Sequence, residues 1–255
     1  MFKDQLIYFF TEIQRIAAFT GLTLRYFFRR PFEYIEFVRQ LYIVGYKSFG
    51  LIGITAFIMG LVLTLQTRPV MAEFGAESWV PTTVMITIVI EIGPVITALL
   101  FAGRVGSRIG AELSSMRVTE QIDAMEVSGT YPMKYLVVTR VLATTIMLPI
   151  LIFYADFIAM IGSYIGYALH NTIGPWLYVR EAFDEVYFHD LFPATIKTIF
   201  FGFFIGVLSC YTGYNTNKGA EGVGMATNSA VILSSLSIFF IDLVAVQLTD
   251  IIVMR

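Results

Sequence analysis

The sequence predicts an all-α integral membrane protein with an N-terminal interfacial amphipathic helix, five transmembrane helices, and a short cytoplasmic helix between the second and third spans. Its mean hydropathy is +0.74, and 57% of its 255 residues are hydrophobic whereas only 14% are charged. Several apolar runs reach the roughly 18 to 20 residues that a helix needs to cross a bilayer core of about 30 Å. At the N-terminus, charged residues instead recur among apolar ones at helical spacing, as in a helix that lies on a membrane surface.

Residues 2–28 form the predicted interfacial helix, within an N-terminal amphipathic region that covers residues 1–44. Apolar side chains recur there at helical spacing, and polar ones such as Glu12 and Arg15 fall on the other side. The charges are too frequent for a membrane span. The helix should end before Pro31, because a proline ring cannot continue it. A soluble extension is the alternative interpretation.

Five apolar runs predict a domain of five membrane spans, which covers residues 45–252. The third run needs an argument of its own, because Asp156 is the only charged residue between positions 141 and 179. That stretch is too long for one untilted crossing and too short for two crossings with a turn. We therefore expect one long helix followed by an ordered outer loop. The predicted spans are residues 45–66, 80–103, 136–168, 195–214 and 229–250.

Lysine and arginine set the expected orientation. Seven of them precede the first span, five lie in or beside the loop at 103–135, and one lies between the fourth and fifth spans, against four on the opposite side. Basic residues favour the cytoplasmic side of a membrane. The N-terminus and the 103–135 loop are therefore expected in the cytoplasm, and the C-terminus on the opposite side of the membrane.

The sequence offers little to an enzyme. It contains neither G-x-S-x-G nor H-E-x-x-H, and its two histidines, His170 and His189, have no cysteine or further histidine at metal-ligand spacing. The phosphate-binding pattern G-x-x-x-x-G-K-[ST] is also missing. We therefore expect that this chain has no catalytic residue and binds no cofactor, metal or nucleic acid. If the protein uses ATP, another subunit must supply the nucleotide site.

The charged residues within the predicted spans include Glu91, Asp156, Lys197 and Asp242. Such groups cost at least a few kcal/mol at membrane depth, so they face protein or water and usually pair. Three interpretations stay open. Lys197 pairs with Asp242 or Glu91 to lock helices together, or the group lines a cavity for a polar headgroup, or it relays protons. Pro94 should kink the second span beside them and help to form a cavity wall.

Small residues recur every four positions at the end of the second span. One set starts at Gly103 and continues through Ser107, and the other contains Gly106 and Gly110. Faces of this kind let two helices approach closely. The contact could be made within the chain or across a dimer.

The stretch "SSMRVTEQIDAMEVSG" that follows predicts a short amphipathic helix. Its apolar side chains recur near the helical period, its acidic ones fall on another face, and Gly129 is a natural stop. A soluble partner can grip such a helix in a groove. Lying on the membrane surface is the less favoured alternative, because helices that do so usually carry a basic polar face.

Three blocks resemble one family in the same order along the chain: "EIGPVITALLFAGRVGSRIGAELSSMRVTEQIDAMEVSG", "YLVVTRVLATTIMLP" and "GYNTNKGAEGVGMATNSAVILSSLSIFFIDL". They are similar to the MlaE/YrbE permeases, the membrane subunits of MCE-linked lipid-transporting ABC systems, from about residue 38 to residue 252. The chain departs from the common pattern at four positions. It has Ser114 where glycine is frequent, Met225 for arginine, Thr139 for proline, and Ile90 where some members carry a basic residue.

The resemblance implies an elbow helix followed by five spans, a homodimer, and assembly with cytoplasmic P-loop ATPase subunits and a periplasmic MCE-domain protein, optionally with a small STAS-domain subunit. ATP and magnesium would then bind in the ATPase. The cargo would be glycerophospholipid, moved between the inner membrane and the MCE partner in support of outer-membrane lipid asymmetry. The alternative is a proton-coupled secondary transporter that uses Glu91, Asp156 and Asp242.

The same resemblance assigns roles to residues. The cytoplasmic helix becomes a coupling helix that docks on the ATPase, with Met116, Glu120, Gln121, Ile122, Asp123, Met125 and Glu126 as its contact residues. The intramembrane charges at Glu91, Lys197 and Asp242 match charged positions of the family. A lipid cavity at the dimer interface would be walled by the first, second and fifth spans, with acyl chains against Ile58, Leu61, Leu65, Val84 and Ile88.

Overall fold

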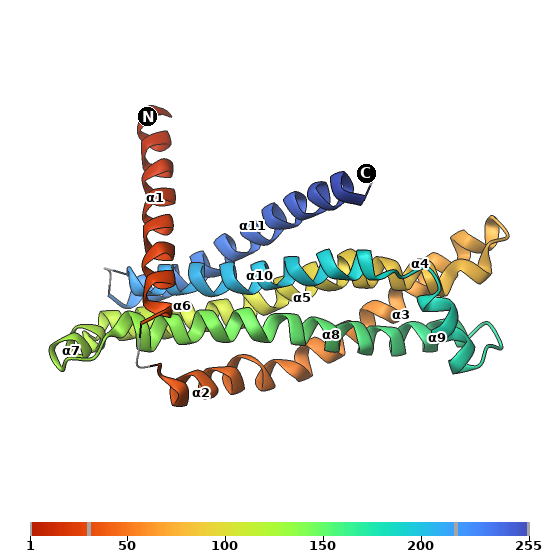
Figure 1. Ribbon diagram of the computed structural model, residues 1–255, viewed down its shortest axis with the longest axis horizontal. Helices are drawn as coiled ribbons and strands as arrows, with labels where there is room; N and C mark the ends of the chain where they lie inside the picture. The colour runs from red at the N-terminus through yellow and green to blue at the C-terminus, as the bar shows by residue number, and fades with distance from the viewer. Residues whose placement is uncertain (1, 30–31, 217–218, 254–255) are drawn as a thin grey trace. The chain divides into compact units, whose positions relative to one another are not determined.

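The computed structural model describes residues 2–29, 32–216 and 219–253, and every regular element within these ranges is a helix (Figure 1). Five helical stretches are long and apolar enough to cross a membrane, which confirms the predicted fold class. The helices extend beyond the apolar runs, because water-exposed turns continue the same backbone hydrogen bonds. The five stretches are Tyr34–Glu73, Glu77–Val118, Met133–Ala168, Leu191–Tyr214 and Ala220–Ile251.

The N-terminal helix α1 (Phe2–Phe27) lies close to its predicted bounds. The Tyr211 hydroxyl donates a hydrogen bond to Glu12 over 2.7 Å, and the Tyr211 ring meets Phe19 edge to face at 5.6 Å. These contacts anchor α1 to α10 (Phe188–Tyr214). The first membrane stretch begins with α2 (Tyr34–Val44), well before the expected residue 45.

Two compact units divide the described residues by contact. The first contains residues 1–44, 102–145 and 202–237, and the second contains residues 45–101, 146–201 and 238–255. Long helices such as α8 (Thr139–Ala168) and α11 (Ala220–Val253) contribute to both. The two units are described separately below.

In the second unit, a chain of buried hydroxyls joins three helices. Ser163 of α8 lies 2.6 Å from Thr64 Oγ1 of α3 (Phe49–Glu73) and 2.5 Å from Tyr178 Oη of α9 (Pro175–Phe183). Burial raises the pKa of Tyr178 to about 12, so its phenol stays neutral and can donate. The Thr82 hydroxyl adds a 2.6 Å bond to the Glu181 carbonyl. The expected outer loop is therefore ordered, and α9 packs beside α4 (Val80–Thr87) (Figure 1).

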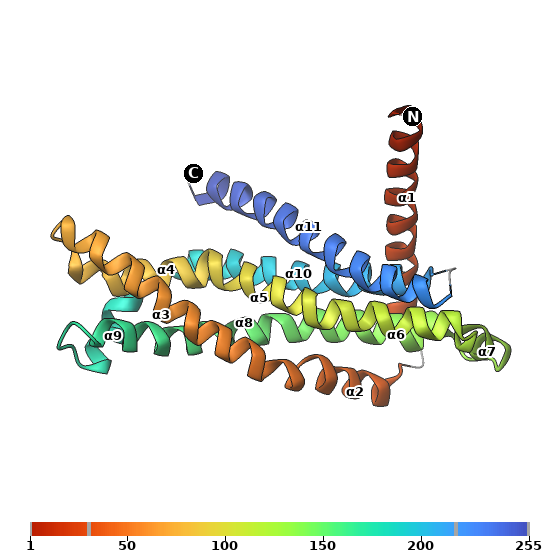
Figure 2. The same cartoon turned by 180° about the vertical axis from the view of Figure 1, so that it is seen from behind.

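Helices α3 and α8 cross with their backbones in contact (Figure 2). A Cβ atom on Gly60 would lie 1.9 Å from the Ala159 carbonyl oxygen, and one on Gly162 would lie 2.2 Å from the Phe57 carbonyl oxygen. In a membrane, where the lipid tails are as apolar as leucine, such close approach is a main source of helix association. The crossing therefore depends on glycine from both helices.

We predict that Gly60→Ala destabilises the protein by about 1–3 kcal/mol, because the added methyl group forces the two backbones apart. Gly50→Ala is the matched control in the same helix, since a Cβ there meets no described atom within 4 Å. Thermal unfolding of the purified variants in detergent measures both. Equal midpoints for the two variants would show that the crossing is not tight.

In the first unit, the small-residue face of the second span packs within the chain. A Cβ on Gly106 would lie 2.8 Å from Ser209 Oγ, and one on Gly110 would lie 3.0 Å from the Ala230 Cβ. Gly106 and Gly110 therefore pack against α10 and α11. This set of small residues makes its close contacts within the chain. Gly103 differs, because a Cβ there would meet no atom of the described residues within 4 Å. Gly103 therefore makes no close helix contact with the part of the chain that the structure describes.

Candidate functional site

The second span is interrupted where its charged residue lies. After α4, residues Ile88–Ile92 form a π-helical turn, and α5 (Gly93–Phe101) continues the span. The Gly93 amide donates to the Ile88 carbonyl, five residues back, and Pro94 has no amide hydrogen to donate. The sequence predicted a kink at Pro94, and the structure has this wider turn directly before it. Glu91 lies within this turn, and turns of this kind are frequent at functional sites.

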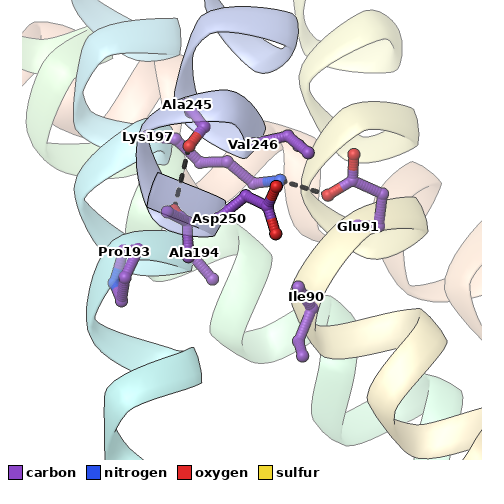
Figure 3. A pocket seen from close by; sticks show the side chains of 9 residues that line it. Ile90, Glu91, Pro193, Ala194, Lys197, Ala245, Val246 and Asp250 are labelled. Atoms are coloured by element: carbon purple, nitrogen blue, oxygen red, sulfur yellow. Dashed lines mark hydrogen bonds and ion pairs between the residues drawn. The ribbon is translucent and has the colours of Figure 1, made fainter. Parts of the chain in front are cut away.

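Three charged side chains from three helices meet in the second unit. Lys197 Nζ lies 2.6 Å from Glu91 Oε2 and 2.9 Å from Asp242 Oδ1 (Figure 3, which draws the bond to Glu91). The lysine is only 4% exposed, whereas Glu91 is the most open of the three. Glu91 and Asp242 were the two predicted partners of Lys197, and both carboxylates bind its ammonium group. The cluster keeps a formal charge of −1 when all three groups are ionised.

An open pocket of about 510 Å³ lies next to this charge cluster. Lys197 and Glu91 stand on one side, as the close-up in Figure 3 shows, and Asp250 and Thr249 add polar groups from α11. The rest of the wall is apolar: Ile90, Pro193, Ala194, Ala245 and Val246. The pocket therefore combines a charged end with an apolar surface. Asp250 was not predicted, although it is the last residue of the fifth apolar run.

Asp156, the fourth intramembrane charge, lies apart from this cluster. It is 8% exposed, and among the described residues its Oδ1 atom has no hydrogen-bond partner. It lines a separate small pocket together with Pro94 and Pro149. The structure thus brings three of the four predicted charges together and leaves the fourth alone.

The residues expected to line a lipid cavity divide into two groups. Ile58 and Leu65 of α3 are exposed, and Leu61 is half-buried. Val84 and Ile88 are only 2% and 0% exposed, so they offer no surface to an acyl chain. That part of the expectation is corrected, because this side of the second span faces the interior of the chain. A helix that is apolar all round gives no indication of which side is buried.

The predicted coupling helix is not one continuous helix. Helix α6 (Ser107–Val118) ends in a turn at Thr119, and α7 (Gln121–Val127) begins after it. Glu120 between them adopts a left-handed backbone conformation with φ 57°. An ion pair between Arg117 and Asp123 closes the turn. Helical spacing continues across a break of this length, so the apolar periodicity could not reveal it.

The side chains assigned to coupling are mostly on the surface. Glu120, Gln121, Asp123 and Glu126 are exposed, and Met116 and Met125 are half-buried. Ile122 is an exception, because it is 0% exposed and therefore holds α7 onto the first unit instead of reaching a partner. The surface of α7 is thus largely acidic and polar, with Ile122 as its buried apolar anchor and Val127 exposed at its end.

A buried arginine connects this region to the third span. Arg140 of α8 donates to Glu112 of α6 over 2.9 Å and to the Leu136 carbonyl over 2.8 Å. Glu112 and Arg140 both belong to the first unit. From the sequence, Arg140 is one of the five basic residues in or beside the 103–135 loop, and nothing in its neighbours indicates burial.

Among the side chains that the structure describes, no group of three His, Cys, Asp or Glu residues could hold a metal ion. The side chain of His189 lies outside those described. Cys210 is a buried free thiol in α10.

Comparison with known proteins places these features in a wider group. Residues 37–248 match the model of a protein family described as Permease MlaE. A probable ABC transporter permease protein of Rickettsia typhi is 36% identical over 242 residues, which is 95% of this chain and 93% of the relative. A protein of the same description from Synechocystis is 35% identical over 226 residues, covering 88% of this chain and 86% of the relative. One from Pyropia yezoensis is 32% identical, with 91% of each chain covered.

Proposed function

The chain belongs to the MlaE permease family, and from this premise we propose that it moves glycerophospholipid between the bacterial inner membrane and a periplasmic MCE-domain partner. As an ABC transporter permease it works with an ATPase partner. ATP and magnesium would bind in that partner, and a small STAS-domain subunit could join the assembly. The proposed orientation places the N-terminus in the cytoplasm and the C-terminus in the periplasm. The proposed role is to support outer-membrane lipid asymmetry.

The pocket beside Lys197 is the observation that carries this proposal. A phospholipid has a charged headgroup attached to apolar chains, and the pocket has charged groups next to an apolar wall. The Lys197 ammonium suits a phosphate, and the carboxylates of Glu91 and Asp250 suit an ethanolamine ammonium. A pocket of about 510 Å³ is large enough for a headgroup and the first part of the chains. The remaining acyl length would lie along exposed apolar faces such as that of α3 at Ile58.

A homodimer is proposed on the exposure of the first and fifth spans. The membrane stretches that contain α3 and α11 are the least buried of the five. Helix α11 also exposes Asn228 and Gln247, two amide side chains that lipid tails cannot hydrogen-bond. A second copy of the chain would cover them and enclose the lipid-binding surface between the two subunits.

The alternative, a proton-coupled secondary transporter, works without an ATPase. Membership of a permease family whose ATPase is a separate partner argues against it. Transport by the purified chain in liposomes under a pH gradient, with no ATPase present, would favour it instead.

Lipid mass spectrometry of the purified complex tests the cargo. We expect bound glycerophospholipid, and we expect Val246→Trp to reduce its amount severalfold by filling the pocket wall. Val244→Trp is the matched control, because it lies on the same helix but does not line this pocket. If the wild-type complex carries no glycerophospholipid, the proposed cargo is wrong. If Val246→Trp retains as much lipid as the control, the pocket is not the binding site.

A further inference from the structure

Asp156 is a buried carboxyl group that the proposed lipid pocket does not use. Its small pocket is lined by the second span, α8 and α10, and these walls carry no other charged residue. Thr195 and Thr198 are the polar side chains nearby, and each donates its hydroxyl hydrogen to a carbonyl of its own helix, at 2.9 and 2.7 Å. Neither therefore has a hydrogen left for the carboxyl group. A carboxylate without a cation would be strongly disfavoured here, so the surroundings favour the neutral acid.

The carboxyl group faces the π-helical turn of the second span. Asp156 Oδ1 lies 2.5 Å from the position that a Cβ on Gly93 would take, and the Ile88 carbonyl oxygen lies at the same distance from that position. The absence of a side chain on Gly93 makes room for both oxygens. Two oxygens that share such a space attract each other only if one carries a hydrogen.

The same turn removes the usual α-helical donor of one backbone carbonyl. The Val89 carbonyl would be served in an α-helix by the Gly93 amide, but this amide bonds to Ile88. One residue further on, Pro94 has no amide hydrogen. Val89 lines the same small pocket as Asp156. A buried carbonyl in this position needs an outside donor, and the neutral acid is the group available to supply it.

We propose that Asp156 is a neutral carboxylic acid that donates a hydrogen bond to the carbonyl of Val89 and thereby positions Glu91 against Lys197. Glu91 lies two residues after Val89, within the turn that this bond holds in shape. Asp156 is thus a positioning residue, which acts on the charge cluster through the backbone without touching the cargo. Its effect on transport rests on the function proposed above, whereas its protonation state does not.

Infrared spectroscopy of the complete transporter complex tests the protonation state directly. We expect the C=O stretch of a protonated carboxyl group at neutral pH, which Asp156→Asn removes. Ser163→Ala is the control, because it alters a buried hydrogen bond of the same helix at α3 and α9. It should leave the band in place. If no protonated band depends on Asp156, the proposal is overturned, whatever the cargo proves to be.

Two substitutions of similar size test the positioning role. Asp156→Asn keeps a donor and should retain lipid-stimulated ATP hydrolysis within about twofold, whereas Asp156→Leu has none and should lower it by about tenfold. Equal losses in both variants, or full activity of the leucine variant, would overturn the proposal. If Asp156→Leu fails to fold, the infrared band and the ATP hydrolysis of Asp156→Asn still test the proposal. If the wild-type complex shows no lipid stimulation, the proposed function fails and the infrared result stands.

Discussion

Lys197→Met is expected to abolish lipid-stimulated ATP hydrolysis and to destabilise the protein by about 3 kcal/mol or more, because it leaves two carboxylates facing each other. The lysine is almost fully buried and is bonded to both Glu91 and Asp242. An unpaired carboxylate at membrane depth is costly, and two that repel each other will push apart the second and fifth spans. Thermal unfolding in detergent and ATPase assays of the reconstituted complex measure the two effects. Lys47→Met, at an exposed lysine, is the control.

A charge-free triple variant separates structure from function at this cluster. Lys197→Met combined with Glu91→Gln and Asp242→Asn removes all three charges together, so we expect most of the lost stability to return. Activity should stay low, because no ammonium group remains for a phosphate. If the triple variant recovers transport as well as stability, the cluster only locks helices together and does not handle the headgroup. A stable and active Lys197→Met would contradict both roles.

Charge reversal on α7 should uncouple the permease from its ATPase. Glu120→Lys combined with Asp123→Lys is expected to lower ATPase co-purification by tenfold or more, and lipid-stimulated ATP hydrolysis with it. The reason is the exposed acidic surface of α7, which suits a groove with basic or polar residues in a soluble partner. Co-purification from the membrane fraction, followed by ATPase assays with added lipid, measures the effect.

Two further variants make this result specific. Asp184→Lys with Glu185→Lys introduces the same charge change after α9 and should leave co-purification unchanged. Gln121→Arg adds a positive charge to the exposed surface of α7. This variant leaves in place the Arg117–Asp123 ion pair, which closes the preceding turn. If the Glu120 and Asp123 double variant binds its ATPase normally, the coupling role assigned to α7 is wrong.

The break at Glu120 illustrates what periodicity can and cannot predict. The apolar spacing on both sides of it fits one helix, and Ile122 falls on the expected apolar side. A single residue in the left-handed conformation turns the chain without altering the pattern enough to be noticed. The pairing of the buried Arg140 with the more exposed Glu112 was missed for a related reason, since two charged residues far apart in sequence carry no sign that they meet.

For the charged residues within the spans, too, some features could be predicted from the sequence and others could not. Their burial could be predicted from the cost of placing charge in lipid, and the ion-pair partners of Lys197 could be narrowed to Glu91 and Asp242. The π-helical turn that aims Glu91 could not be predicted beyond a kink at Pro94, because its shape depends on what packs against Gly93. For the same reason, the sequence could not tell that Asp156 would be left alone.

The sequence by itself determined the fold class, the five membrane stretches and the helical N-terminal region. Lipid cannot hydrogen-bond a backbone, so an apolar run of sufficient length has to be helical. Only the tertiary structure decided which side of each apolar helix is buried, as Val84 and Ile88 show, and which charges meet. Inside a membrane, hydrophobicity does not distinguish lipid from protein. The choice of neighbours therefore depends on close fit at residues such as Gly60 and on pairing at residues such as Lys197.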